Sequence, residues 1–344
     1  MNQNEWNTLL AVVNGCSQPQ VPTGFIVDCP WLPGWYGSNL TDYFSDDQCW
    51  FEANKKAIET FPDTIFLPGF WPEYGMCTEP SAFGSKCQWF EKNMPHAEKV
   101  LRSLSEVDLL TKPNVRTHGL LPFVIRRLKR MQPQIESMGH QVKFAVARGP
   151  LNIASFLLGS TELMVAMMTD QDRCHKLVDL ITDFLIDWIG YQIESFPTIE
   201  GVFLLDDIVG FLGDDQCNEY VVPYFKKIYS AFDTKINMFH NDSNGLVSTP
   251  YLFRMGVNLF NPSFEHSLHE LKELAGNKVA ILGNIPPRDV LAEGTPQDIQ
   301  AAVKKSVSGL TDMSRIILSC GGGMPQNVSS ENIKAFIDAA SLVR

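Results

Sequence analysis

Eight short apolar runs, each ending in polar or glycine-rich residues, constrain the fold of this chain most strongly. They span residues 25–28, 64–67, 144–147, 202–206, 236–240, 257–260, 279–282 and 316–320. Continuous apolar runs of this length are typical of parallel strands that are buried on both faces. Helical patterns lie between many of them, and the clearest spans residues 174–194. Strand and helix therefore alternate along the chain, which is typical of a parallel α/β fold.

The number of runs favours a closed barrel over an open sheet, so we predict a (β/α)8, or TIM, barrel. Further helices are expected at 218–232, 268–274, 296–307 and 330–342, and the long interval 68–143 must hold others. No linker, repeat or low-complexity stretch divides the 344 residues. We therefore predict a single domain over residues 1–344, with an N-terminal helical extension at 1–20.

Composition excludes several classes of protein. The formal net charge is −11 and the one short basic cluster is at 126–130, so we expect no nucleic-acid partner. No segment has 18 consecutive apolar residues, so we expect no membrane span. The first residues lack the basic region and apolar run of a signal peptide, and the eight cysteines form no C-x-x-C pair. Reduced thiols in a cytoplasmic protein are the simplest expectation.

Polar side chains gather where the predicted strands end. They are Asp28, Cys29, Arg148, Asp206, Asp207, His240, Asn241, Asp242, Asn261, Asn284 and Cys320. The segments that enter the strands are mostly apolar, so the polarity is one-sided. Because the loops after the strands carry the active site in such barrels, we expect a small-molecule site there. From this end of the barrel we expect Arg148, Asn241, Asn284 and Gly322 to bind the substrate.

His240 and Asp242 are two residues apart at a strand end, and such residues point to the same face. An imidazole and a carboxylate can begin a zinc site or form a general acid/base pair. Cys320 ends the eighth run before three glycines, and it could complete a His240/Asp242/Cys320 zinc site with an open fourth position. The alternatives are a histidine hydrogen-bonded to a turn aspartate, and a small buried cysteine before a glycine turn.

Asp206 and Asp207 are adjacent carboxylates at the end of the run at 202–206. Adjacent residues of a strand point to opposite faces, so the two side chains should point in opposite directions. One of them should face the barrel mouth, where it could take a proton or bind nitrogen atoms of a substrate. The alternative is a structural role, in a helix cap or a salt bridge, and the sequence does not show which of the two faces inward. Together with His240, both remain candidate catalytic residues.

Four motifs, in this order, resemble the uroporphyrinogen decarboxylase superfamily. Residues 147–159 read ARGPLNIASFLLG, Asp206-Asp207 is followed by VPYFKKI at 222–228, residues 278–287 read KVAILGNIPP, and residues 318–325 read LSCGGGMP. The resemblance covers about residues 140–344, and the earlier part is similar only loosely. It implies the same barrel fold and makes a homodimer an expectation.

The resemblance implies two types of enzyme. The cofactor-free decarboxylases use N-terminal arginines, a tyrosine and a late histidine, whereas this chain has GFIVDCPW at 24–31, Phe156 and Gly322 at those places. The methylcobalamin:thiol methyltransferases hold zinc with a His-x-Cys and a later Gly-Cys-Gly motif. Here the first motif reads His240-Asn241-Asp242, and glycine replaces the later cysteine while Cys320 lies two residues earlier.

The residues and the resemblance together favour a methyltransferase of corrinoid-linked methyl metabolism. Its expected cofactors are zinc and a methylcobalamin or corrinoid co-substrate, and its expected partners are a small-molecule substrate and a corrinoid protein. A metal-free decarboxylase of a tetrapyrrole or another carboxylic acid is the second hypothesis. A barrel that binds a corrinoid or porphyrin without catalysis is the third.

Overall fold

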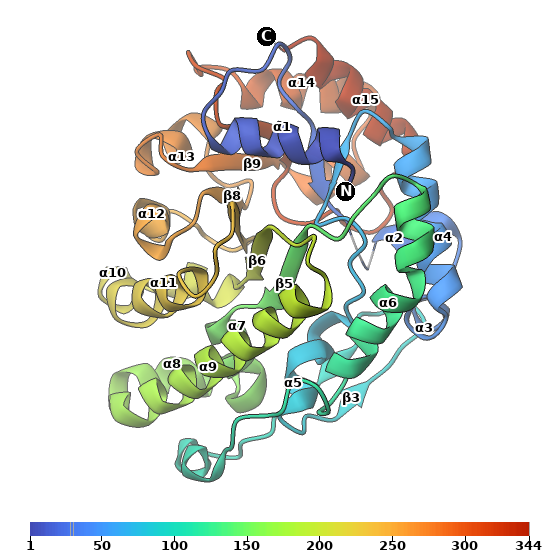
Figure 1. The fold of residues 1–344 in the computed structure, drawn as a ribbon. Coiled ribbons are helices and arrows are strands. Elements are labelled where there is room, and N and C mark those ends of the chain that lie inside the picture. Colours follow the sequence, from blue (N-terminus) through green and yellow to red (C-terminus); the bar gives the residue numbers. More distant parts are fainter. Residues whose placement is uncertain (28, 30, 344) are drawn as a thin grey trace.

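Eight parallel strands form the centre of the computed structural model, which describes residues 1–344 except 28, 30 and 344 (Figure 1). They are β1 (Gly24–Ile26), β2 (Ile65–Leu67), β5 (Phe144–Arg148), β6 (Gly201–Leu205), β7 (Ile236–Asn241), β8 (Leu259–Pro262), β9 (Ala280–Ile285) and β10 (Ile316–Cys320). Each of the eight predicted runs contributes one strand, so the predicted α/β barrel is confirmed. A small antiparallel hairpin, β3 (Cys87–Gln88) and β4 (His96–Ala97), lies outside this set.

The strands follow one another around a ring. We call the place between β2 and β5, where the described residues show no strand pairing, the seam. Strands β5 to β10 form one six-stranded parallel sheet, and bridges from Thr23 to Leu318 and from Ile26 to Gly323 join β1 to β10. Strand β2 pairs with β1, but the described residues show no pairing of β2 with β5. The side-chain amide of Gln192 instead makes two hydrogen bonds of 3.0 Å with the backbone of Val146. These bonds satisfy edge groups of β5 that would otherwise be buried unpaired.

Alternate strand residues face two separate cores. The barrel interior holds Phe203, Leu205, Met238 and Ile317, whereas Leu204, Phe239 and Leu318 pack under the outer helices. Successive side chains of a strand point to opposite faces. The polar residues that follow each strand therefore point either into the barrel or toward the outer helices. This alternation decides which strand-end groups reach the barrel mouth.

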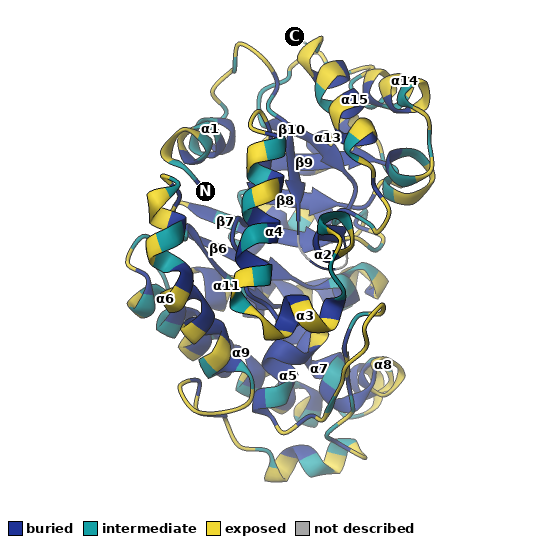
Figure 2. Cartoon of the chain, turned by 90° about the vertical axis from the view of Figure 1, so that its right-hand side faces the viewer, coloured by how far each residue is buried: buried dark blue, intermediate teal, exposed yellow. Residues whose placement is uncertain are grey.

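Helices cover the outside of the barrel, with their exposed faces turned to solvent (Figure 2). The α-helices after the first are α2 (Trp31–Tyr36), α3 (Leu40–Ser45), α4 (Asp47–Thr60), α5 (Thr78–Ala82), α6 (Leu121–Ser137), α7 (Pro150–Leu158), α8 (Ser160–Thr169), α9 (Gln171–Ser195), α10 (Asp214–Gln216), α11 (Val222–Tyr229), α12 (Leu252–Met255), α13 (Leu268–Leu274), α14 (Pro296–Ser306) and α15 (Ser330–Ser341). Short 3-10 or π turns are η1 (Gly75–Cys77), η2 (Leu104–Leu109), η3 (Asp207–Phe211), η4 (Cys217–Val221), η5 (Thr249–Tyr251) and η6 (Pro287–Ala292).

The predicted helices are all present, and the interval 68–143 holds η1, α5, η2 and α6 as expected. Among the described residues, no single helix is long and apolar enough to cross a membrane. Only α7 and α8, which are bent by 105° relative to each other, meet the length and composition criteria as a pair.

Helix α1 (Gln3–Val13) closes the end of the barrel where the strands begin. Asn2 and Glu5 form a capping box that starts the helix. Trp6 and Leu9 are buried in the interior core. The rings of Trp6 and Phe144, the first residue of β5, pack edge to face with their centroids 5.5 Å apart. The predicted N-terminal extension therefore plugs the N-terminal end of the barrel. The opposite end, where the strands finish, is the mouth.

A candidate metal centre at the barrel mouth

Strand alternation separates the two adjacent aspartates. Asp206 follows the outward direction of Leu204, and its fully buried Oδ2 accepts a 2.8 Å hydrogen bond from the backbone N–H of Leu151 in the first turn of α7. Burial raises the pKa of Asp206 to about 8. Asp207 follows the inward direction of Leu205 and lies at the mouth, with 35% of its side chain exposed. Asp206 thus anchors a helix, and its predicted catalytic role has no geometric support.

Asp207, His240 and Asp242 converge at the mouth from the ends of β6 and β7. One possible ligand atom from each residue lies within 4.8 Å of the others. His240 Nε2 is 3.7 Å from Asp207 Oδ1, and the backbone N–H of Asp242 donates to the same oxygen at 3.1 Å. Partial desolvation in the mouth, and then the neighbouring Asp207 carboxylate, raise the pKa of Asp242. The cluster concentrates negative charge beside an imidazole.

Asn261 fixes the orientation of the His240 ring. The two residues are partners in the β7–β8 register, and His240 Nδ1 lies 2.6 Å from Asn261 Oδ1. Asn261 Nδ2 donates to the carbonyl of Leu282 at 2.7 Å, so Oδ1 must be the acceptor and Nδ1 of the ring the donor. In the neutral ring this places the lone pair on Nε2, the atom nearest Asp207. Histidine ligands of metals are usually held by such a hydrogen bond.

Replacing Asn261 by alanine should weaken metal binding about 10- to 100-fold, because the His240 ring loses the bond that sets its tautomer. Competition against a chromogenic chelator would measure the change in affinity. Asn258→Ala is a suitable control, because Asn258 lies before β8 and its side chain bonds to backbone groups of Asn237 and Lys235 at the opposite end of the barrel. Unchanged affinity in Asn261→Ala would show that His240 needs no such support.

The donor set fits a divalent transition metal. Two carboxylates and one oriented imidazole give three protein ligands and leave positions for a substrate, as in catalytic zinc sites. Histidine nitrogen and carboxylate oxygen are both donors that bind zinc in proteins. Among the described residues, this is the one cluster of three His, Cys, Asp or Glu side chains with such spacing.

Cys320 does not join this cluster. It continues the outward direction of Leu318, is fully buried in the outer core, and burial raises the pKa of its thiol to about 12. The prediction of Cys320 as a metal ligand assumed that the chain stays extended to residue 322. Gly322 instead has φ +73°, and the chain turns there. A Cβ atom on Gly322 would lie 2.9 Å from Asp242 Cβ, so the glycine leaves room for the aspartate.

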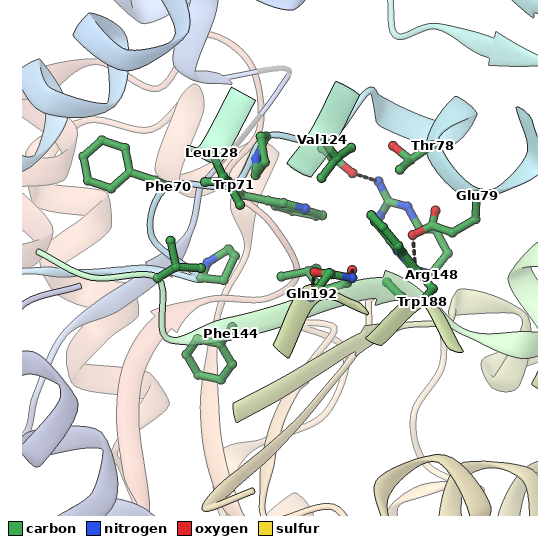
Figure 3. A pocket seen from close by; sticks show the side chains of 16 residues that line it. Phe70, Trp71, Thr78, Glu79, Val124, Leu128, Phe144, Arg148, Trp188 and Gln192 are labelled. Atoms are coloured by element: carbon green, nitrogen blue, oxygen red, sulfur yellow. Dashed lines mark hydrogen bonds and ion pairs between the residues drawn. The ribbon is translucent and has the colours of Figure 1, made fainter. Parts of the chain in front are cut away.

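The predicted substrate-binding residues are dispersed. Arg148 is buried in an ion pair with Glu73 (Figure 3). Asn241 faces outward, and its Oδ1 accepts from Ser243. Asn284 donates to the backbone carbonyls of Ser263 and His266, so it holds the loop after β8. Of the predicted set, only Gly322 contacts the cluster, and it does so through Asp242.

Sequence reasoning missed two features of the mouth. Asp207 was expected as a catalytic group and not as a ligand, and Asn261 was noted as polar without a role. Asn261 could have been recognised because it ends the strand after His240, and neighbouring strand ends lie at one height. Asp28, another polar strand-end residue, lies outside the described residues.

The fold and the cluster define a parallel α/β barrel protein with a candidate metal centre at its mouth. Residues 38–342 match the uroporphyrinogen decarboxylase (URO-D) family, and the chain belongs to it. It is 24% identical over 279 residues to a uroporphyrinogen decarboxylase of Ruthia magnifica, with 76% of each chain covered. It is 28% identical over 258 residues to the methylcobamide:CoM methyltransferase MtbA of Methanosarcina mazei, covering 72% of this chain and 70% of that protein.

Among solved structures, a methyltransferase from Methanosarcina mazei superposes with a TM-score of 0.80 at 18% identity, over 96% of both chains. At this identity the superposition supports the shared fold. The family thus includes both decarboxylases and corrinoid-linked methyltransferases, and its named members are enzymes.

Proposed function

We propose that this protein is a metal-assisted methyltransferase of corrinoid-linked methyl metabolism. The observation that carries the proposal is the convergence of Asp207, His240 and Asp242 at the barrel mouth. Zinc is the metal we expect there, and methylcobalamin or a corrinoid protein is the expected methyl donor, as the name of the MtbA relative suggests. A cytoplasmic homodimer without nucleic-acid or membrane partners completes the proposal.

The residues of the mouth have separate tasks. Asp207 and Asp242 supply carboxylate oxygens, and His240 supplies Nε2, because its Nδ1–H is held by Asn261. When bound, zinc supplies Lewis acidity, which lowers the pKa of a methyl acceptor and makes it a better nucleophile. Gly322 lacks a Cβ that would lie 2.9 Å from Asp242 Cβ, so the Asp242 side chain has room beside it.

The ligand set also bears on the acceptor. Two carboxylates donate less charge to the metal than two thiolates would, so the metal remains a stronger Lewis acid. We therefore expect acceptors beyond thiols, with an oxygen or nitrogen nucleophile. The site would then differ from those of relatives that are named for coenzyme M.

The charges around the mouth disfavour decarboxylation of uroporphyrinogen. A substrate with many carboxylates needs several cationic partners. Arg148 is already paired with Glu73 in a buried position, and the mouth itself carries Asp207 and Asp242. His240 and, more weakly, Arg288 lower the pKa of Asp242, against the larger raising effects of burial and Asp207.

Zinc-loaded protein should consume methylcobalamin in the presence of a suitable thiol, alcohol or amine, and the cobalamin absorbance would report the transfer. Asp207→Ala should lose this activity. Uroporphyrinogen, incubated in parallel, should release no carbon dioxide. Metal-independent carbon dioxide release would instead establish the decarboxylase hypothesis. Tight corrinoid binding with no turnover of any acceptor would establish the non-catalytic one.

A further inference from the structure

A cavity of about 30 Å³ lies at the barrel seam between β2 and β5, apart from the metal centre (Figure 3). Its walls include the aromatic rings of Phe70, Trp71 and Trp188, and none of the three candidate metal ligands lines it. A single buried water needs roughly 10–15 Å³ of such space, so the cavity admits a guest of a few heavy atoms.

Three charged residues line this cavity: Glu73, Glu79 and Arg148. Arg148 forms an ion pair with Glu73, and its backbone N–H donates to Glu79 Oε1 at 3.3 Å. Glu73 is 5% exposed and Glu79 is 3% exposed, and one oxygen of each, Glu73 Oε1 and Glu79 Oε2, has no hydrogen-bond partner among the described residues. Buried polar atoms of this kind are rare without an occupant that satisfies them.

The charges of the cavity do not balance when both carboxyl groups are ionised. Among the described residues that line the cavity, two carboxylates then face a single guanidinium and the others are uncharged. Burial raises the pKa of Glu79 to about 7, although Arg148 opposes this effect. A cation in the cavity would restore neutrality and displace the proton from Glu79.

The walls select among small cations. Alkali ions require several oxygen ligands, whereas the cavity offers two free carboxylate oxygens and large aromatic surfaces. Indole faces attract weakly hydrated cations, and the Trp71 ring already lies 5.4 Å from the Arg148 guanidinium carbon. An ammonium group with a short alkyl substituent matches both features, because its N–H groups can donate while its methyl group packs on the rings.

We propose that the seam cavity binds a small alkylammonium ion, with methylammonium as the simplest member of the class. Glu73 Oε1 and Glu79 Oε2 accept its N–H hydrogen bonds, and Trp71 and Trp188 enclose its alkyl group. This site is independent of the metal and of the proposed methyl transfer.

Thermal unfolding of the full chain at pH 8 tests the proposal. Methylammonium chloride should raise the melting temperature saturably, by roughly 3 °C at a hundredfold excess over its Kd, relative to sodium chloride at equal ionic strength. Calorimetry at pH 7 in buffers of different ionisation enthalpy should show proton release on binding. Glu79→Gln, which keeps an acceptor for the Arg148 N–H, should remove both signals. Glu52→Gln, on helix α4 and outside the cavity, should keep them.

Trp188→Phe provides a second variant, since it leaves both carboxylates in place and should weaken binding without abolishing it. The proposal is overturned if methylammonium gives no saturable rise, or if Glu79→Gln responds like the unmodified protein. An equal response to potassium would also overturn it, because the site would then select charge alone. A crystal structure from methylammonium solution with only water in the cavity would have the same consequence.

Discussion

His240→Ala should abolish metal binding: the purified protein should fall from about one equivalent of zinc to under about a tenth. His240 is the only nitrogen donor of the cluster, and its removal leaves Asp207 and Asp242 as two neighbouring negative charges without the third ligand. Methyl transfer should fall by roughly 10²-fold or more, because loss of a direct ligand exceeds the 10- to 100-fold effect of its supporting groups. Elemental analysis and the cobalamin assay would measure the two effects.

His269→Ala is the matched control for this variant. His269 lies on α13 with 52% of its side chain exposed, and it forms an ion pair with Glu273 on the same helix. Its substitution should leave metal content and activity unchanged. If His240→Ala kept a full equivalent of metal while remaining folded, the cluster would not be the binding site.

Asp206→Ala and Asp207→Ala should affect different properties although the residues are adjacent: the first should lower stability and the second should remove the metal. Asp206→Ala should lower the free energy of unfolding by about 2 kcal/mol, because a buried N–H in the first turn of α7 loses its acceptor. The metal should be retained. Asp207→Ala should lose the metal but change the metal-free stability by less than about 1 kcal/mol, since its side chain is partly exposed.

Urea unfolding of the metal-free variants, together with metal analysis, would separate the two roles. Asp206→Asn refines the comparison, because asparagine keeps an oxygen acceptor for Leu151 and should recover much of the lost stability. The assignment would be contradicted if Asp206→Ala lost the metal, or if Asp207→Ala unfolded the protein.

The strands and helices could be predicted from the sequence because each depends on a local pattern of apolar residues. Each barrel strand is an apolar run buried on two sides, and α9 carries its apolar face over many turns. His240 and Asp242 were also predictable as a pair, since a spacing of two residues points them to the same side at the end of β7.

The remainder of the site depends on facts that the sequence does not carry. Whether Asp206 or Asp207 faces inward depends on strand phase, and a shift of one residue exchanges the two faces. Cys320 was misplaced because the positive φ of Gly322 turns the chain just after β10. Glu73 lies 75 residues before Arg148, so their ion pair arises from the tertiary fold and not from a local motif.

X-ray absorption spectroscopy of the zinc-loaded protein would test the ligand set most directly. Coordination by Asp207, His240 and Asp242 predicts a first shell of only oxygen and nitrogen atoms, at about 2.0–2.2 Å, with the multiple-scattering signature of one imidazole. Cys320→Ala should give the same spectrum. A sulfur scatterer at about 2.3 Å that disappears in Cys320→Ala would contradict the account, because the thiol would then be a ligand.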